Sequence, residues 1–269
     1  MKDLKNDFFK KGYVIVNFFS KKEIQDLLAK VESYYLKLAK TKKVLIPSLK
    51  EYHKIEISEK IHKSLMHPNQ RQIKIPNKIV KKILKNETIK SIKLQLYGNK
   101  KIIIVQEYQN ILRSNFAGLR IVKPFSATSG VHCEKSSPGE NWDPITLWFP
   151  LFGLNKNYSL NIAPYSHKQL HPKKEIIKDN RYLARAYNDK YLSNFKFFRP
   201  NLKIGQVIIF HPNLLHGGSI CKGKYSRISA EVRIMREEHF IKRKNYFILP
   251  KKNKRKIRLS NKYIKKKYY

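Results

Sequence analysis

The alternation of apolar and polar residues from Ser226 to Ile234 is the feature that most constrains the fold. Because successive side chains of a strand point to opposite faces, it predicts a β-strand with one apolar face. The apolar members are Ile228, Ala230, Val232 and Ile234, and the polar members are Arg227, Ser229, Glu231 and Arg233. Upstream, the β-branched run from Gln206 to Phe210 lies between Gly205 and Pro212 and predicts a buried strand. A β-rich fold is therefore expected.

Between these two strands, His216 is followed by Gly217 and Gly218, and Gly223 lies further along the same loop. Glycines allow the backbone to turn sharply, so the ring of His216 can be presented with little obstruction. Arg227, on the return strand, offers a planar, permanently charged group for a carboxylate. A metal-binding His facing such an Arg suits an iron site that uses a 2-oxo acid. On these residues alone, a β-hairpin with a polar tip and a solvated Arg fits equally well.

A second motif lies upstream, where His132 and Glu134 are two residues apart. On a strand these two side chains share one face. Together with His216 they make two imidazoles and one carboxylate, the facial set of non-haem Fe(II) oxygenases, which leaves metal positions open. Asp143 is the rival carboxylate and ranks second, because its loop would have to fold back toward the histidines.

Four segments resemble the phytanoyl-CoA dioxygenase-like branch of the Fe(II)/2-oxoglutarate dioxygenases. The first, Gly12 to Ile24, is similar to the opening strand and helix of that family, and His132-Cys133-Glu134 falls at its first two metal ligands. Ile145 to Leu151 and Asn157 to His167 are similar to its core strands and its Pro-Gly-Ser-His signature, with Tyr165 replacing Gly. The last segment, Phe210 to Gly218, matches the one that holds the third ligand. The resemblance covers roughly residues 10 to 236.

The resemblance implies a role for each matching residue. His132, Glu134 and His216 would hold Fe(II), although the family usually has Asp at the position of Glu134. Arg227 lies eleven residues beyond His216, where the family's Arg grips the carboxylate of 2-oxoglutarate. Ser229 would donate a hydroxyl on the same face. Trp148 matches an aromatic residue that lines the 2-oxoglutarate pocket, and core packing is an equally good interpretation of it.

The expected fold is mainly β with flanking helices, on a double-stranded β-helix (jelly-roll, cupin-like) core. A single domain is expected over residues 1–250, with a helical portion at about 20–97 and the jelly-roll core at about 101–236. Ser20 and Glu23 form a capping box that predicts a helix through about Lys40. Further helices are expected near 49–66 and from Pro76. Strands are expected at 13–19, 101–106, 118–123, 131–134, 145–151 and 159–163. Residues 1–11 are expected to fray, 110–117 to connect two strands, and 168–203 to form a long insertion without periodicity.

The net charge of +39 makes polyanions plausible partners for non-specific binding. The competing interpretation is compositional, because Lys, Asn and Ile all have codons made only of A and T. The tail 251–269 is more than half Lys and Arg and is expected to be solvated. Only Cys133 and Cys221 occur, which gives no disulfide framework and suits a reducing cytoplasm, where the protein is expected. No signal peptide or membrane span is predicted; the oligomeric state stays open.

The expected function is an Fe(II)- and 2-oxoglutarate-dependent dioxygenase. With O2 it would hydroxylate an unactivated C–H bond of a small metabolite or carbohydrate-type precursor. Two other classes stay open: a non-catalytic jelly-roll binding protein, and a polyanion-binding protein that uses its basic surface.

Overall fold

The computed structural model describes residues 4–54, 65, 76–107, 112–114, 131–135, 143–153, 160–172, 175–179, 182–217, 226–240 and 247–249. The strand expected at 118–123 and the basic tail 251–269 lie outside these residues, as do Gly218 and Gly223. No helix in the described part of the chain has the length and apolar character needed to cross a membrane.

A seven-stranded antiparallel sheet organises the molecule. Its strands lie in the order β1 (Tyr13–Asn17), β8 (Gln206–Phe210), β4 (Ile145–Phe152), β10 (Ser226–Arg236), β2 (Ile102–Glu107) and β11 (Phe247–Leu249), and β3 (Leu112–Ser114) also pairs with β10. The strands expected at 13–19, 101–106, 145–151, 206–210 and 226–234 are thus present. Because β4 lies between β8 and β10, these two strands do not form the β-hairpin that the sequence left open.

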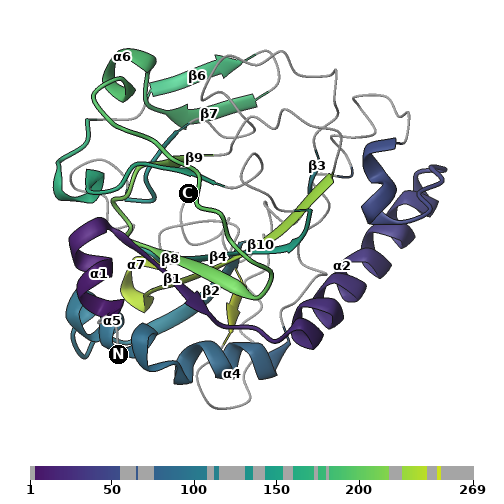
Figure 1. Ribbon diagram of the computed structural model, residues 1–269, viewed down its shortest axis with the longest axis horizontal. Coiled ribbons are helices and arrows are strands. Elements are labelled where there is room, and N and C mark those ends of the chain that lie inside the picture. Colours follow the sequence, from purple (N-terminus) through teal and green to yellow (C-terminus); the bar gives the residue numbers. More distant parts are fainter. Residues whose placement is uncertain are drawn as a thin grey trace, which may run out of the picture.

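One face of this main sheet is covered by three helices, α2 (Lys21–Thr41), α4 (Asn77–Lys85) and α5 (Glu87–Tyr97), as Figure 1 shows. The capping box is confirmed: the Ser20 hydroxyl accepts from the backbone of Glu23, whose carboxylate accepts from the backbone of Ser20. The apolar positions of β10 pack in the same cluster as Ile24, Leu27 and Val31 of α2. The predicted apolar face of β10 is therefore confirmed, and it faces the helices.

The prediction that residues 1–11 fray is wrong for residues 4–11, and residues 1–3 lie outside the described part of the chain. Residues 4–11 form α1 (Leu4–Lys11), whose Phe8 side chain is completely buried. The apolar area that Phe8 removes from water stabilises this short helix, and Asp7 and Lys11 form a salt bridge of 3.0 Å along it. The backbone N–H of His211 donates to the carbonyl of Gly12 and ties the end of α1 to the end of β8.

A second, smaller layer lies on the other side of the main sheet. It pairs β5 (Asn161–Ile162) with β9 (His216–Gly217), and isolated bridges extend it to His132 and Phe198. The strands expected at 131–134 and 159–163 are thus shorter than predicted, a single bridge and two residues. Gly217 has no positive φ; instead, an added Cβ would lie 3.1 Å from Val131 Cγ2. Gly217 therefore permits close strand approach and does not serve the sharp turn that the sequence suggested.

Several irregular stretches differ from expectation. Residues 168–203 contain a hairpin of β6 (Glu175–Asp179) and β7 (Tyr182–Ala186), followed by α6 (Asp189–Leu192). The expected connection at 110–117 contains β3, and the chain beyond β10 continues into α7 (Glu237–Phe240) and β11. Near residue 49 the described helix is the short 3-10 helix η1 (Leu49–Lys54), and Pro76 is the N-cap of α4, one position before its first turn. A further 3-10 turn, η3 (Ser166–Lys168), follows β5.

Candidate metal centre

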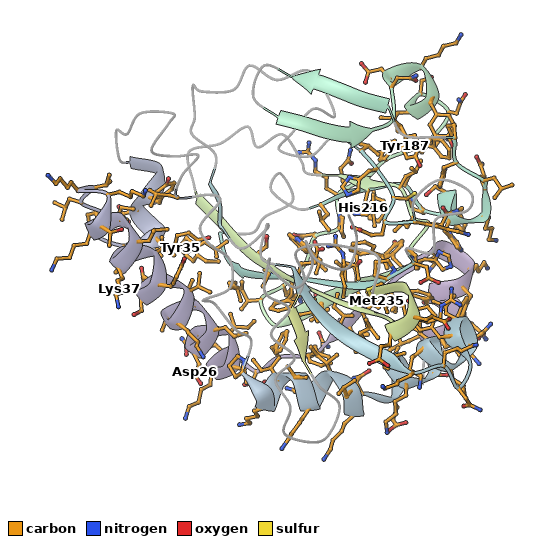
Figure 2. The ribbon with its side chains drawn as sticks, turned by 180° about the vertical axis from the view of Figure 1, so that it is seen from behind. Asp26, Tyr35, Lys37, Tyr187, His216 and Met235 are labelled. Atoms are coloured by element: carbon orange, nitrogen blue, oxygen red, sulfur yellow. The ribbon has the colours of Figure 1, made fainter. Side chains whose placement is uncertain are left out.

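Three side chains from two distant parts of the chain converge on the side of the main sheet that faces the smaller layer. They are His132, Glu134 and His216, and each offers one ligand atom within 4.8 Å of the others. Glu134 Oε1 lies 3.8 Å from His132 Nε2 and 3.4 Å from His216 Nε2. Two backbone hydrogen bonds of 2.8 Å join His132 and His216 across adjacent strands, which explains how residues so far apart in sequence meet. Figure 2 shows His216 between the main sheet and the β6–β7 hairpin.

The orientation of His216 suits metal binding through Nε2. Its Nδ1 lies 2.9 Å from the carbonyl of Leu214, which can only accept, so Nδ1 carries the proton and Nε2 keeps its lone pair. Burial lowers the pKa of His216, and the neighbouring His132 lowers it further, although Glu134 opposes both. The imidazole is therefore neutral near pH 7, as a ligand must be. The ring of Phe210 packs against it, with centroids 4.5 Å apart.

Glu134 is held ionised although it is buried. Burial by itself would raise its pKa, but the interactions with the adjacent His132 and His216 outweigh that effect and hold the pKa below its ordinary value. The carboxylate also accepts a hydrogen bond of 2.6 Å from Arg233 Nη2. The same nitrogen lies 2.6 Å from Glu231 Oε1. One guanidinium thus joins a carboxylate of the small layer to a carboxylate of the main sheet.

The other residues singled out in the sequence divide into three groups. Asp143 lies 2.7 Å from Arg236, on the other face of β10 from Arg233, and is not among the residues that meet at the metal centre. Ser229 and Trp148 are both buried; Trp148 packs with Ile208, Phe210 and Leu214 beneath the histidines. Arg227 occupies the β10 position paired with Arg113, and its side chain lies outside the described residues.

The sequence profile of the phytanoyl-CoA dioxygenase family matches residues 8–229 of this chain. The chain belongs to that family. No curated protein sequence matches it. Among solved structures, it resembles EctD from S. alaskensis with 2-oxoglutarate and 5-hydroxyectoine, at 15% identity and a TM-score of 0.50, over 89% of this chain and 77% of EctD. It also resembles EvdO2 from Micromonospora carbonacea var. aurantiaca complexed with 2-oxoglutarate, at 13% identity and a TM-score of 0.50, over 87% of this chain and 89% of EvdO2. These likenesses concern the fold.

Within this phytanoyl-CoA dioxygenase family member, sequence reasoning missed Arg233 and Glu231 as parts of the site. It assigned both to the polar face of β10 and gave roles on that face only to Arg227 and Ser229. The structure buries both, at 4% and 5% exposure, so this face is the floor of the site. A signal was available: if Arg227 reaches a buried pocket, then residues two, four and six positions further along the strand share its face.

The side of His132-Cys133-Glu134 that turns away from the metal centre is structural. The thiol of Cys133 donates to the carbonyl of Lys135 at 3.0 Å and lies 3.3 Å from the hydroxyl of Tyr187. His171 lies behind it and contacts the Tyr191 hydroxyl at 2.7 Å and the Asn213 carbonyl at 2.9 Å. These contacts fasten the 168–203 segment to the small layer and so hold the ligand-bearing backbone in place. His167, the last residue of the Pro-Gly-Ser-His-like segment, contacts the Phe9 carbonyl at 2.9 Å and is not in the centre.

Proposed function

We propose that the protein is an Fe(II)- and 2-oxoglutarate-dependent dioxygenase that hydroxylates a small molecule. The observation that carries the proposal is the convergence of His132, Glu134 and His216 in a member of this family. Two neutral imidazole nitrogens and one carboxylate oxygen are the donor set that non-haem Fe(II) sites use, with positions left open for other ligands. The donor set therefore fits iron. Glutamate in place of the usual aspartate keeps the negative charge and lengthens the side chain by one methylene group.

We extend the proposal to the fold as a double-stranded β-helix that makes one domain of residues 1–250. The strand order β2-β10-β4-β8 of the main sheet and the small layer of His132, β9, β5 and Phe198 support two facing antiparallel sheets. The metal centre lies between them, since Glu134 belongs to the small layer and its partner Arg233 to the main sheet. The similarity in fold to EctD and EvdO2 supports this arrangement of two facing sheets.

The floor of the site offers a hydrogen-bonding group to a co-substrate such as 2-oxoglutarate. Thr146 Oγ1 is fully buried and has no hydrogen-bond partner within the described part of the chain, and its residue is paired with Arg233 across the sheet. Leaving a buried hydroxyl unsatisfied is costly, so a bound ligand is its natural partner. We propose that Arg227 binds the distal carboxylate, that Ser229 and Thr146 donate hydroxyl hydrogen bonds, and that Trp148 forms the apolar wall.

The protein's own residues would bind the metal, the co-substrate and the substrate, orient them, and exclude water from the site. When bound, Fe(II) and 2-oxoglutarate supply the oxidation: O2 is reduced as 2-oxoglutarate loses CO2 to give succinate, and one C–H of the substrate becomes C–OH. The side chains of Glu134 and His216 are 7% and 5% exposed, while that of His132 is 22% exposed. Substrate would therefore approach from the His132 side. Phe210 and Trp148 close the opposite side to water.

The substrate class that we favour is a small metabolite or a carbohydrate-type precursor, and hydroxylation is the favoured outcome. The 5-hydroxyectoine in the EctD structure is a small molecule of comparable kind. A reducing compartment such as the cytoplasm suits ferrous iron and the buried thiol of Cys133.

The test is spectroscopic and anaerobic. Fe(II) and 2-oxoglutarate are added to purified protein, and the weak visible charge-transfer band of the chelated complex is recorded. We expect a band in the wild type, its loss in Glu134→Gln and His216→Ala, and a weaker band in Arg227→Ala. Asp143→Asn is the matched control for the carboxylate and should keep the band, since Asp143 pairs with Arg236 instead. On admission of O2, succinate should form. A folded wild-type protein without a band would refute the proposal.

We also propose weak, non-specific binding of polyanions, which a basic groove favours. The groove holds about 810 Å³ and is lined by lysines of α4, together with residues from the end of β1 and the start of α2: Asn17, Phe18, Glu23, Lys78, Lys81, Lys82, Lys85 and Asn86. Such binding should ignore metal and fall steeply with salt. Heparin retention that does not change between low and high salt would contradict it.

A further inference from the structure

We propose that Arg233, braced by Glu231, positions the Glu134 carboxylate for the metal, so that this site requires glutamate where the family usually has aspartate. The inference rests on the proposed metal site and names a positioning residue for it. It starts from one guanidinium nitrogen, Arg233 Nη2, which lies 2.6 Å from Glu134 Oε1 and 2.6 Å from Glu231 Oε1.

The burial of this trio makes the contact consequential. The side chains of Glu134, Arg233 and Glu231 are between 5% and 7% exposed. The contact with Glu134 is a charge-assisted hydrogen bond and that with Glu231 is an ion pair, and salt screens such buried contacts much less than exposed ones. Removing one partner of a buried pair leaves an uncompensated charge, so neither carboxylate can move away freely. The orientation of Glu134 is therefore set by Arg233 as well as by its own backbone.

The geometry also explains the length of the side chain at position 134. Glu134 starts from the small layer and must present its carboxylate to His132, to His216 and to Arg233 on β10. An aspartate is shorter by one C–C bond, about 1.5 Å. Drawing the carboxylate back by that amount would lengthen the contact with Arg233 to about 4 Å, beyond hydrogen-bond range. An aspartate could then satisfy the histidines or Arg233, but not both.

Positioning and simple charge predict opposite results, which makes the proposal testable. If Arg233 acted only as a positive charge near the site, its removal would strengthen the binding of a divalent cation. If it orients the ligand carboxylate, its removal weakens binding, because outer-shell partners of metal ligands typically contribute about 10- to 100-fold in affinity. The direction of the change in metal affinity therefore decides between the two roles.

The experiment measures Co(II) binding to the full chain by calorimetry and by the visible d–d spectrum. We expect Arg233→Met to bind Co(II) about 10- to 100-fold more weakly with an altered spectrum, and Arg233→Lys to recover part of the loss. Glu134→Asp should also weaken binding. In the Arg233→Met background, Glu134→Asp should add little further loss, because the contact it breaks is already gone. Arg236→Met is the matched control on the same strand, since Arg236 pairs with Asp143 away from the site, and should leave affinity and spectrum unchanged.

Other outcomes separate this inference from the proposed function. Wild-type protein that binds no Co(II) would overturn both. Wild-type binding together with equal or tighter binding by Arg233→Met would overturn the positioning role alone. Should Arg233→Met fail to fold, the Glu134→Asp variant decides, because it keeps all three charges. Glu134→Asp that binds Co(II) as tightly as the wild type would overturn the requirement for glutamate.

Discussion

Protonation of His211 at acid pH should lower the free energy of unfolding, and replacing this residue should remove much of that pH dependence. His211 follows β8 and packs against His167 and Phe8, with ring centroids 5.0 Å and 5.8 Å away. Its Nδ1 accepts a hydrogen bond of 3.1 Å from the backbone N–H of Asn213, so the ring is held neutral. Burial lowers the pKa of His211 to about 3, and the nearby His167 and Lys135 contribute in the same direction.

The sign and size of the effect follow from linkage. A histidine whose pKa is lowered by folding does not reduce the free energy of unfolding above its unfolded pKa of 6.5. The free energy of unfolding then decreases as the pH falls from 6.5 toward 3. At pH 5 the unfolded chain holds nearly one proton more than the folded chain at this site, which corresponds to a loss of about 2 kcal/mol. Burial also lowers the pKa of His167, so the neighbouring ring adds to the loss.

The assay is chemical unfolding at pH 7 and pH 5, with the difference in the free energy of unfolding compared between wild type and His211→Asn. An asparagine oxygen can replace Nδ1 as the acceptor and has no proton to gain. We expect the difference to shrink by about 2 kcal/mol in the variant. Lys37→Gln, at an exposed position of α2 marked in Figure 2, is the control and should behave like the wild type. An unchanged difference in His211→Asn would refute the reasoning.

Three further predictions concern other parts of the molecule. Gly12→Ala should lower the free energy of unfolding by about 2 kcal/mol or more in urea titrations, since Gly12 has φ +86° and an added Cβ would lie 2.5 Å from His167 Nδ1. Tyr97→Phe should cost about 1–3 kcal/mol in the same assay, because the Ile145 N–H would lose the buried hydroxyl that accepts from it at 3.0 Å. Co(II) at one hundred times its Kd should raise the free energy of unfolding by about 2.7 kcal/mol, and a chelator should reverse this in a thermal melt.

Local patterns predicted the parts of the fold that depend on neighbouring residues. The capping box of Ser20 and Glu23 marked the start of α2, and the alternation of β10 indicated which of its residues face the helices. The three candidate ligands were found because the i, i+2 spacing of His132 and Glu134 puts both on one side of the backbone. His216 was singled out by the glycines that follow it, and the resemblance then supported joining it to the other two, which no spacing rule could have done.

The features that were missed depend on long-range contacts. The sequence of α1 is too short and polar to predict a stable helix, and it forms because Phe8 finds a buried site beside His211. The contact between Gly217 and Val131 needs two chain segments to be brought together first. An arginine such as Arg233 is usually exposed to solvent. Its burial here is possible because its charge is paired with the carboxylates of Glu134 and Glu231.

The burial of β10 on both faces limits how this protein can change over evolution. From Ile228 to Ile234 every residue is buried, with the apolar members against the helices and the charged members in the site. Inserting or deleting a single residue there would exchange the faces, sending Arg233 into the apolar core and an isoleucine toward the histidines. Changes of length are therefore expected to accumulate only in the connecting segments, so new substrates can be accommodated by remodelling the loops around an unaltered strand.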